Sequence, residues 1–291
     1  MRIGVDLGGT KIEVLALDGC GEVLLRRRAA TPAGSYSAIL ETIAGLVEGL
    51  ESELGEVASV GVGSPGAASL KTGAMKNCNT TCLNGQPLQG DLSARLGREV
   101  RLANDANCFA LSEAVDGSGA EATTVFGVIL GTGVGGGLVV NKQLLVGGNA
   151  IAGEWGHNPL PGAFEDRPCY CGRRDCIETY LCGAGLLTSF RRHGGRASSV
   201  EQLVALADSG DACAGEVLEN YCRALARALA LVINIVDPEV IVLGGGLSNI
   251  PLLYRRVPEL WGQWVFSDEC RSRLLPARYG DSSGVRGAAW L

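Results

Sequence analysis

Carboxylates and thiols stand at several points of this sequence where they could bind a metal ion or move a proton. Asp6 ends an apolar stretch and is followed by Gly8, Gly9, Thr10 and Lys11. Glycines let backbone N–H groups approach phosphate oxygens, and the threonine hydroxyl and lysine amine add donors and positive charge. The Asp6 carboxylate can hold Mg²⁺ through water. These residues predict a phosphate-binding turn, although a Gly-Gly-Thr sequence by itself also fits an ordinary hairpin.

Two further glycine turns follow apolar stretches later in the chain, at residues 131–133 and 244–246. None of the three turns has the spacing of a P-loop, which needs four residues between its glycines and a Gly-Lys-Ser/Thr ending. Three glycine turns, each directly after an apolar strand, suit a nucleotide that is held from two sides. The predicted nucleotide-binding residues are Gly4, Asp6, Gly8, Gly9, Thr10, Lys11, Gly131, Thr132, Gly133, Gly244, Gly245 and Gly246.

Another carboxylate stands where a predicted strand meets a predicted helix, in the sequence Asn104-Asp105-Ala106-Asn107. A carboxylate at such a junction can accept the proton of an attacking hydroxyl group. Aspartate is also a good helix N-cap. The sequence alone therefore leaves two roles open for Asp105, a general base and a cap.

A histidine and three cysteines have the spacing of a metal site. His157 is followed by Cys169, Cys171 and Cys176. One imidazole and three thiolates form a closed tetrahedral set for a structural zinc ion. Three unligated thiols are the alternative, and the crowded Cys-Tyr-Cys sequence argues against an unreactive core pair.

The elements that must position these residues repeat along the chain. Residues 2–17 predict a strand, a glycine turn and a second strand, and residues 125–140 repeat that order. Placing Gly4 on Gly127 aligns the two hairpins at an offset of 123 residues, which indicates an internal duplication. Two related α/β halves are typical of the actin, Hsp70 and hexokinase group. That fold is ribonuclease H-like, and its two domains hold a nucleotide in the cleft between them.

We expect the boundary between the two halves near residues 118–123. Residues 1–119 would form an N-terminal α/β domain with the first phosphate turn and Asp105. Residues 120–283 would form a C-terminal α/β domain with the metal set and the other glycine turns. The terminal residues 284–291 are expected to pack back on the first domain.

Composition and charge exclude several classes of protein. The chain has 291 residues, of which 46% are hydrophobic and 19% charged, as in a folded chain with a large core. The net charge of −6 argues against nucleic acid as a partner, because phosphate binding needs clustered cations. Residues 122–141 carry no charge but hold six glycines, so they predict a buried strand pair rather than a membrane span.

Glycine and cysteine are both frequent. The 43 glycines cluster beside strand-like segments, and we interpret them as tight turns near a ligand. The eleven cysteines are an odd number in a chain too long to need disulfide bonds for its stability. Since a charged residue and a strand also open the chain, we expect no signal peptide and a cytoplasmic protein.

At this point the motifs resemble those of a known family. DLGGTK at 6–11, NDAN at 104–107, EWGH at 154–157 and CYCGRRDCIE at 169–178 resemble the signature segments of ROK proteins, in the expected order. That family contains glucokinases, N-acetylhexosamine kinases, fructokinases and sugar-responsive repressors. A repressor of this kind carries a helix-turn-helix before its first glycine strand, and here that strand begins at residue 2. A chaperone ATPase, the other alternative, would not explain the zinc set.

Three longer segments look closest to bacterial fructokinases of the manno(fructo)kinase type. They are KNCNTTCLNGQPL at 76–88, EWGHNPLP at 154–161 and YGDSSGVRGAAWL at 279–291. The resemblance implies an ATP-dependent kinase that converts D-fructose to D-fructose 6-phosphate, with mannose as a secondary substrate. A glucokinase or an N-acetylhexosamine kinase of the same family is the alternative. The resemblance also implies ATP, Mg²⁺ and structural Zn²⁺ as cofactors and a homodimer as the assembly.

The same resemblance implies roles for single residues. Asp105 would be the base on the 6-hydroxyl group. The residues that hold the sugar would be Asn104, Asp105, Glu154, His157 and Glu178, and zinc would be bound by His157, Cys169, Cys171 and Cys176. One imidazole nitrogen of His157 would bind zinc while the other faces the sugar.

Two departures from the family pattern stand near the metal set. The segment between His157 and Cys169 is short, which leaves the lid over the sugar undefined. Asp175 replaces a glycine that is usual before the last cysteine. Aspartate tolerates the left-handed region better than most residues, so we expect the zinc site to be retained.

Overall fold

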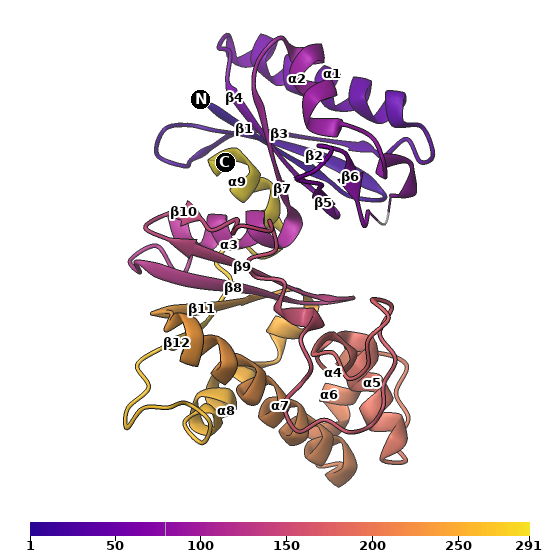
Figure 1. Cartoon of the computed structure of the whole chain (residues 1–291), viewed down its shortest axis with the longest axis vertical. Helices are drawn as coiled ribbons and strands as arrows, with labels where there is room; N and C mark the ends of the chain where they lie inside the picture. The colour runs from indigo at the N-terminus through magenta and orange to yellow at the C-terminus, as the bar shows by residue number, and fades with distance from the viewer. Residues whose placement is uncertain (79) are drawn as a thin grey trace.

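Two five-stranded sheets with the same strand order form the framework of the computed structural model, which describes residues 1–78 and 80–291 (Figure 1). The first sheet has the order β3-β2-β1-β4-β7 and the second the order β10-β9-β8-β11-β12. The first sheet consists of β1 (Arg2–Leu7), β2 (Lys11–Leu17), β3 (Val23–Ala30), β4 (Ser59–Ser64) and β7 (Val100–Asn104). The second consists of β8 (Thr124–Leu130), β9 (Val134–Val140), β10 (Gln143–Leu144), β11 (Val240–Gly244) and β12 (Arg273–Pro276).

The helices and the short elements connect and cover these sheets. The longer helices are α1 (Tyr36–Leu54), α2 (Leu88–Leu96), α3 (Asp105–Val115), α5 (Gly183–Arg192), α6 (Val200–Asp208), α7 (Ala212–Val236), α8 (Pro251–Trp261) and α9 (Ser283–Trp290). The short elements are β5 (Ala67–Ala68), β6 (Met75–Lys76), α4 (Glu178–Leu181) and the 3₁₀ turns η1 (Thr81–Leu83), η2 (Trp155–His157), η3 (Gly246–Asn249) and η4 (Gly280–Ser282).

The strand pairing confirms the predicted duplication. In each half a hairpin is followed by a parallel partner of its first strand, since β1 pairs with β2 and β4 as β8 pairs with β9 and β11. The hairpins close at different lengths: Leu7 pairs with Ile12 in the first, and Leu130 pairs with Val134 in the second. The second turn is thus one residue shorter, so the offset of 123 holds only up to the turns. Residues 122–141 contain the strand pair β8 and β9, as predicted.

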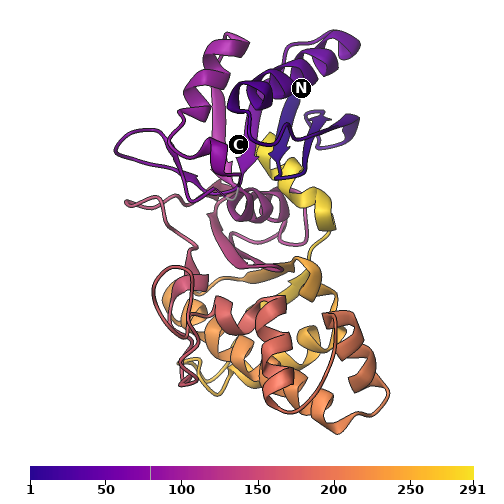
Figure 2. The same ribbon diagram turned by 90° about the vertical axis from the view of Figure 1, so that its right-hand side faces the viewer.

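The outer faces of the sheets carry the two largest cores. Helices α1 and α2 cover the first sheet, and α5 to α8 cover the second (Figure 2). The longest helix, α7, starts at the cap Asp211, whose side chain accepts from the N–H of Ala214. It ends at Asp237, whose φ of 49° lies in the left-handed region, directly before Pro238. Among the described residues, no helix is both long and apolar enough to cross a membrane.

The space between the sheets is filled by two crossed helices. Helix α9 packs on β1 and β4 of the first sheet, whereas α3 packs on β8 and β9 of the second (Figure 1). By packing, α3 belongs with the second sheet and α9 with the first. The limits 1–119 and 120–283 therefore stay a proposal that follows the order of the chain.

Several glycines make this close packing possible. A Cβ atom on Gly4 would lie 2.0 Å from the carbonyl oxygen of Val285, and one on Gly61 would lie 1.9 Å from that of Ala288. A Cβ atom on Gly287 would lie 1.6 Å from the carbonyl oxygen of Cys108 in α3. The interpretation of the glycines as ligand turns was therefore wrong for this group, which lets α9 approach the first sheet and α3.

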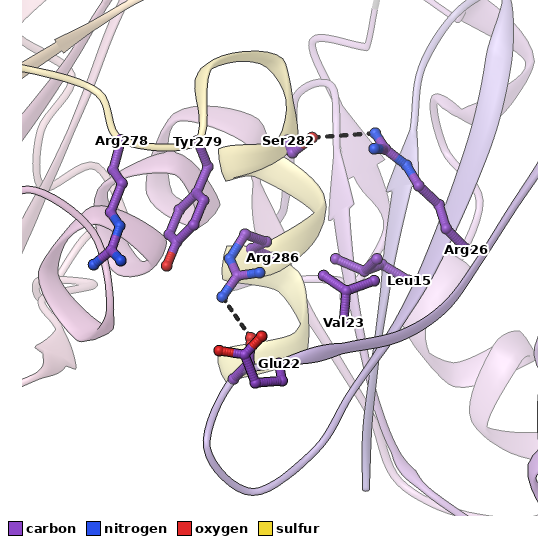
Figure 3. Close-up of a pocket in the computed structure, with 9 residues that line it drawn as sticks. Leu15, Glu22, Val23, Arg26, Arg278, Tyr279, Ser282 and Arg286 are labelled. Carbon is purple, nitrogen blue, oxygen red and sulfur yellow. Dashed lines mark hydrogen bonds between the residues drawn. The ribbon is translucent and has the colours of Figure 1, made fainter.

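A pocket of about 380 Å³ lies where the β2–β3 turn meets the segment that leads into α9 (Figure 3). Arg286 stacks on the ring of Tyr279 at 3.8 Å, donates to the carbonyl of Gly21 and pairs with Asp116. Arg26, which also lines this pocket, pairs with buried Glu13. Because two of the three arginines that line the pocket are paired with carboxylates, we interpret the pocket as a joint between the domains.

Candidate active site

The parallel strands of the first sheet bring the acidic residues to one edge. Asp6 is in register with Gly63 of β4, and Gly63 is in register with Ala103 of β7. The carboxyl ends of β1, β4 and β7 therefore align, and Asp105 follows β7 directly. Burial raises the pKa of Asp6 to about 6, and the nearby carboxylate of Asp105 contributes to that rise. The two carboxylates thus share one site at this edge.

Asp105 is not the cap of α3. That role belongs to Asn104, whose side chain accepts from the N–H of Asn107 at 2.7 Å. Asp105 is the first helical residue, and its Oδ1 accepts from the N–H of Ala106 at 2.8 Å. Solvent reaches the carboxylate, but protein atoms surround it, and this burial raises the pKa of Asp105 despite the backbone N–H of Ala106. A carboxylate with raised pKa is a stronger base.

Some backbone groups of the first glycine turn form hydrogen bonds within the protein and are not available to a ligand. The N–H of Gly8 donates to the carbonyl of Lys11 at 3.0 Å, and the Thr31 hydroxyl donates to the carbonyl of Gly8 at 2.8 Å. Gly9 and Thr10 are exposed at the tip, and the Lys11 ammonium lies 3.6 Å from Glu13. Of the predicted residues, Gly9, Thr10 and Lys11 can therefore approach a phosphate.

The second glycine turn is tied to a carboxylate. The N–H of Gly131 donates to the carbonyl of Gly133, which leaves Thr132 exposed at the tip. Oε2 of Glu178, at the start of α4, accepts from the N–H of Val134 at 2.9 Å. It would also lie 2.8 Å from a Cβ atom on Gly133, so only glycine allows this approach.

The start of β9 lies beside predicted sugar-binding segments from both domains. A Cβ atom on Gly135 would lie 3.0 Å from Cβ of Ala106, the residue after Asp105. Nε1 of Trp155 donates to the carbonyl of the same Gly135 at 3.1 Å, and Glu154 directly precedes this tryptophan. The segments that carry Asp105, Glu154, His157 and Glu178, predicted to bind the sugar, therefore meet around residues 133–135.

Two glycines predicted to bind the nucleotide are packing residues instead. Gly4 lies in the middle of β1 against α9, as described above. Gly244 is buried, and a Cβ atom there would lie 2.4 Å from the ring of Phe109 in α3. Gly245, with a φ of 81°, and Gly246 are exposed at the end of β11. The third turn can therefore offer only these two residues to a ligand.

The histidine and the three cysteines lie together as predicted. Their ligand atoms are all within 4.8 Å of one another. The Sγ atoms of Cys171 and Cys176 are 3.7 Å apart, and Sγ of Cys169 is 3.5 Å from Nδ1 of His157. Ligands of a tetrahedral zinc ion with Zn–S near 2.3 Å lie ~3.8 Å apart for two sulfurs and ~3.5 Å for sulfur and nitrogen. The donor set and its spacing fit zinc.

Asp175 shows why the departure from glycine is tolerated. Its φ is 53°, in the left-handed region that was expected at this position. Its carboxylate accepts from the N–H groups of Asp166 and Arg167, at 3.1 and 2.9 Å, and from the hydroxyl of Tyr180 at 2.5 Å. Asp175 therefore adopts the left-handed turn, and its side chain also stabilises the metal loop through these hydrogen bonds.

Three polar residues near the site were not identified from the sequence. The hydroxyl of Tyr170 lies 2.9 Å from Nε2 of His157, the ring nitrogen that does not face the Cys169 thiol. Oγ1 of Thr80 and Oδ1 of Asn107 are buried without a hydrogen-bond partner among the described residues. A Cβ atom on Gly9 would lie 3.7 Å from Oγ1 of Thr80. The Cys-Tyr-Cys and NDAN motifs contained two of these residues, but motif spacing does not show where a side chain points.

The duplicated fold, with its carboxylates and glycine turns at the edges between two halves, defines a two-domain phosphotransferase of the hexokinase-like class. The model of the ROK family matches residues 2–291, and the chain belongs to this family. Its relatives identify it as an ATP-dependent sugar kinase of the family. N-acetyl-D-glucosamine kinases of Salmonella typhimurium strain LT2 and of Escherichia coli O139:H28 are each 40% identical over 299 residues, covering 100% of this chain and 99% of theirs.

Solved structures agree with this assignment. The ROK hexokinase from Thermus thermophilus has a TM-score of 0.89 and 30% identity, covering 99% of this chain and 96% of that one. A ROK family glucokinase from Streptomyces griseus in complex with glucose and AMPPNP has a TM-score of 0.76 and 28% identity, covering 99% and 97%. These comparisons do not support the expected fructokinase specificity. The names of the full-length relatives favour the alternative, an N-acetylhexosamine kinase.

Proposed function

We propose that the protein transfers the terminal phosphoryl group of ATP to the 6-hydroxyl group of a hexose, with Asp105 as the base. The observation that carries this proposal is the placement of Asp105. Its carboxylate stands at the start of α3 without a capping role, its pKa is raised by burial, and it lies beside Asp6. A base in this state can accept the proton of the attacking hydroxyl group.

Each of the two domains would bind part of the nucleotide. Gly9, Thr10 and Lys11 would hold the phosphates from the first domain, and the turns at 131–133 and 245–246 would approach from the second. Asp6 offers a carboxylate oxygen of the kind that Mg²⁺ prefers, so it would hold a magnesium ion near the phosphates through water. When bound, Mg²⁺ supplies positive charge that neutralises the phosphoryl oxygens.

On the sugar side, the side-chain oxygen of Asn104 caps α3, and its amide nitrogen makes no hydrogen bond to any residue that the structure describes. Glu154 and Glu178 bring carboxylates that can accept from sugar hydroxyl groups. Zinc on His157, Cys169, Cys171 and Cys176 would be structural, because four protein ligands leave no open position.

Two sugars are candidates. N-acetyl-D-glucosamine is favoured by the full-length relatives at 40% identity. Fructose, with mannose as a second substrate, is favoured by the resemblance of residues 76–88, 154–161 and 279–291 to fructokinases. One residue of the first segment, Asn79, lies outside the described residues. A panel of fructose, mannose, glucose and N-acetyl-D-glucosamine, read by sugar-dependent ADP release, decides between them.

Asp105→Asn tests the base. Asparagine keeps the size of the side chain and its acceptor for the N–H of Ala106, so the fold should persist. Turnover should fall by roughly 10²–10⁴-fold, the usual contribution of a positioned base. Asp268→Asn, at an exposed position of the second domain, is the matched control. Nearly normal turnover in Asp105→Asn would remove Asp105 from the mechanism.

We also propose a homodimer in a reducing compartment such as the cytoplasm. All eleven cysteines are free of disulfide bonds, which supports the second part. Light scattering of the purified protein would measure the assembly mass, and a monomeric mass at micromolar concentration would exclude the dimer.

A further inference from the structure

Tyr170 stands between two metal ligands, Cys169 and Cys171, and turns back onto a third. Its hydroxyl oxygen lies 2.9 Å from Nε2 of His157, and the two rings meet edge to face with centroids 5.1 Å apart at 88°. The residue is nevertheless 83% exposed. A large aromatic ring is thus fixed by one polar contact in an otherwise open part of the site.

The metal loop determines the direction of this hydrogen bond. Nδ1 of His157 faces the thiol of Cys169 at 3.5 Å, so Nδ1 is the nitrogen that can bind zinc. A neutral imidazole that binds a metal through Nδ1 carries its proton on Nε2. Nε2–H then donates to the oxygen of Tyr170, and the O–H of Tyr170 remains free to donate into the site.

The surroundings of Tyr170 are those predicted for the sugar. The carboxylates of Glu154 and Glu178 lie near the Tyr170 hydroxyl. The phenol hydroxyl carries one proton that it can donate. Tyr170 thus adds an aromatic wall and a hydroxyl group to the side of the site that holds His157.

Sugar geometry identifies which substituent meets this wall. In a hexopyranose, C2 lies across the ring from C5, which carries the 6-hydroxymethyl group. In fructofuranose, C2 and C3 lie opposite C5. With the 6-hydroxyl group at Asp105 and the ring held by Glu154, His157 and Glu178 as proposed, these carbons would lie on the side away from α3. A hydroxyl group there can accept from Tyr170, whereas an N-acyl group needs the space that the phenol fills.

We propose that Tyr170 is a specificity-determining residue that favours hexoses without an N-acyl group over N-acetyl-D-glucosamine. This inference rests on the proposed phosphorylation of a hexose at its 6-hydroxyl group. It assigns to one side chain a preference for unacylated hexoses, whereas the full-length relatives are named as N-acetyl-D-glucosamine kinases.

The test compares kcat and KM for fructose, mannose, glucose and N-acetyl-D-glucosamine in the wild type, Tyr170→Ala and Tyr170→Phe. The wild type should prefer its best unacylated hexose by at least about tenfold in kcat/KM, within the range that shape and one polar contact provide. Tyr170→Ala should reduce this ratio at least about fivefold, through a lower KM for N-acetyl-D-glucosamine. Tyr170→Phe keeps the wall but loses the donor, so it should raise KM for the unacylated hexose roughly two- to tenfold.

Phe164→Ala is the matched control, because Phe164 is an equally exposed aromatic residue of the segment between His157 and Cys169, at 91%. It should leave the ratio unchanged, and zinc content should be equal in all variants. A wild type that prefers N-acetyl-D-glucosamine, or a ratio that Tyr170→Ala does not move, would overturn the role of Tyr170. A protein that phosphorylates none of the four sugars would instead overturn the proposed function.

Discussion

Asp6→Asn is expected to stabilise the ligand-free protein at neutral pH while it impairs catalysis. Asp6 is held among protein atoms with the carboxylates of Asp105 and Glu13 nearby, and only Lys11 counters them. Its charge is therefore unfavourable in the free enzyme and becomes useful only when Mg²⁺ and phosphates arrive. Asparagine has the same shape without the charge.

The magnitude follows from the pKa. A pKa of about 6 in place of the ordinary 3.8 corresponds to ~3 kcal/mol if the side chain were fully buried. Because Asp6 is partly accessible to solvent, we expect a gain of ~1–2 kcal/mol in the free energy of unfolding. The folded state of the wild type binds the Asp6 proton more tightly than the unfolded state does. The free energy of unfolding of the wild type therefore falls as pH rises from 3.8 to about 6.

The assay is urea unfolding of both proteins with a chelator present, at pH values from about 4 to about 8. The stability difference between Asp6→Asn and wild type should grow from about pH 4 and level off above about pH 7, because the wild-type carboxyl is then fully ionised. Mg²⁺ and ATP should stabilise the wild type more than the variant. A variant that is no more stable than wild type at pH 7.5, or a difference independent of pH, would refute the reasoning.

Three further variants test other parts of the structure. Cys171→Ser should lower zinc content, measured by atomic absorption, and raise the sugar KM, while nucleotide binding is largely retained; unchanged zinc and activity would leave the cysteines as free thiols. Gly287→Ala should lower the free energy of unfolding by ~3 kcal/mol, because its Cβ atom would meet the carbonyl oxygen of Cys108; a smaller loss than that of Gly284→Ala, where space is open, would contradict this packing. Asp175→Gly keeps the left-handed turn but loses three accepted hydrogen bonds, so zinc should be removed faster by a chelator, and an equal rate would show that the carboxylate does not brace the loop.

The sequence predicted the features that depend on local pattern. Apolar strands ending in glycine turns showed both hairpins and their duplication, since alternation and turn chemistry are local properties. The metal set could also be predicted, because a histidine and three cysteines have few other roles at that spacing. These predictions needed only the order of residue types along the chain.

What the sequence could not show depends on residues far apart in the chain. The sequence pattern assigns Gly4 to a glycine-rich phosphate site. In the structure its missing side chain makes room for α9, which follows about 280 residues later in the chain. Asn104 and Asp105 are equally good caps by type, and only the backbone path shows that Asn104 takes the role. Tyr170 gained its importance from the fold of the metal loop, which turns its hydroxyl onto His157.

The exchange of α3 and α9 between the halves also affects how the chain can be synthesised and cut. The first sheet emerges from the ribosome early, but α9, which covers its inner face, is made only after the whole second sheet. Until Ser283–Trp290 is available, Gly4 and Gly61 face an empty groove, and the carbonyl of Leu291 cannot accept from Arg101. A truncation that removes α9 would therefore damage the first sheet, and with it the strand that carries Asp6.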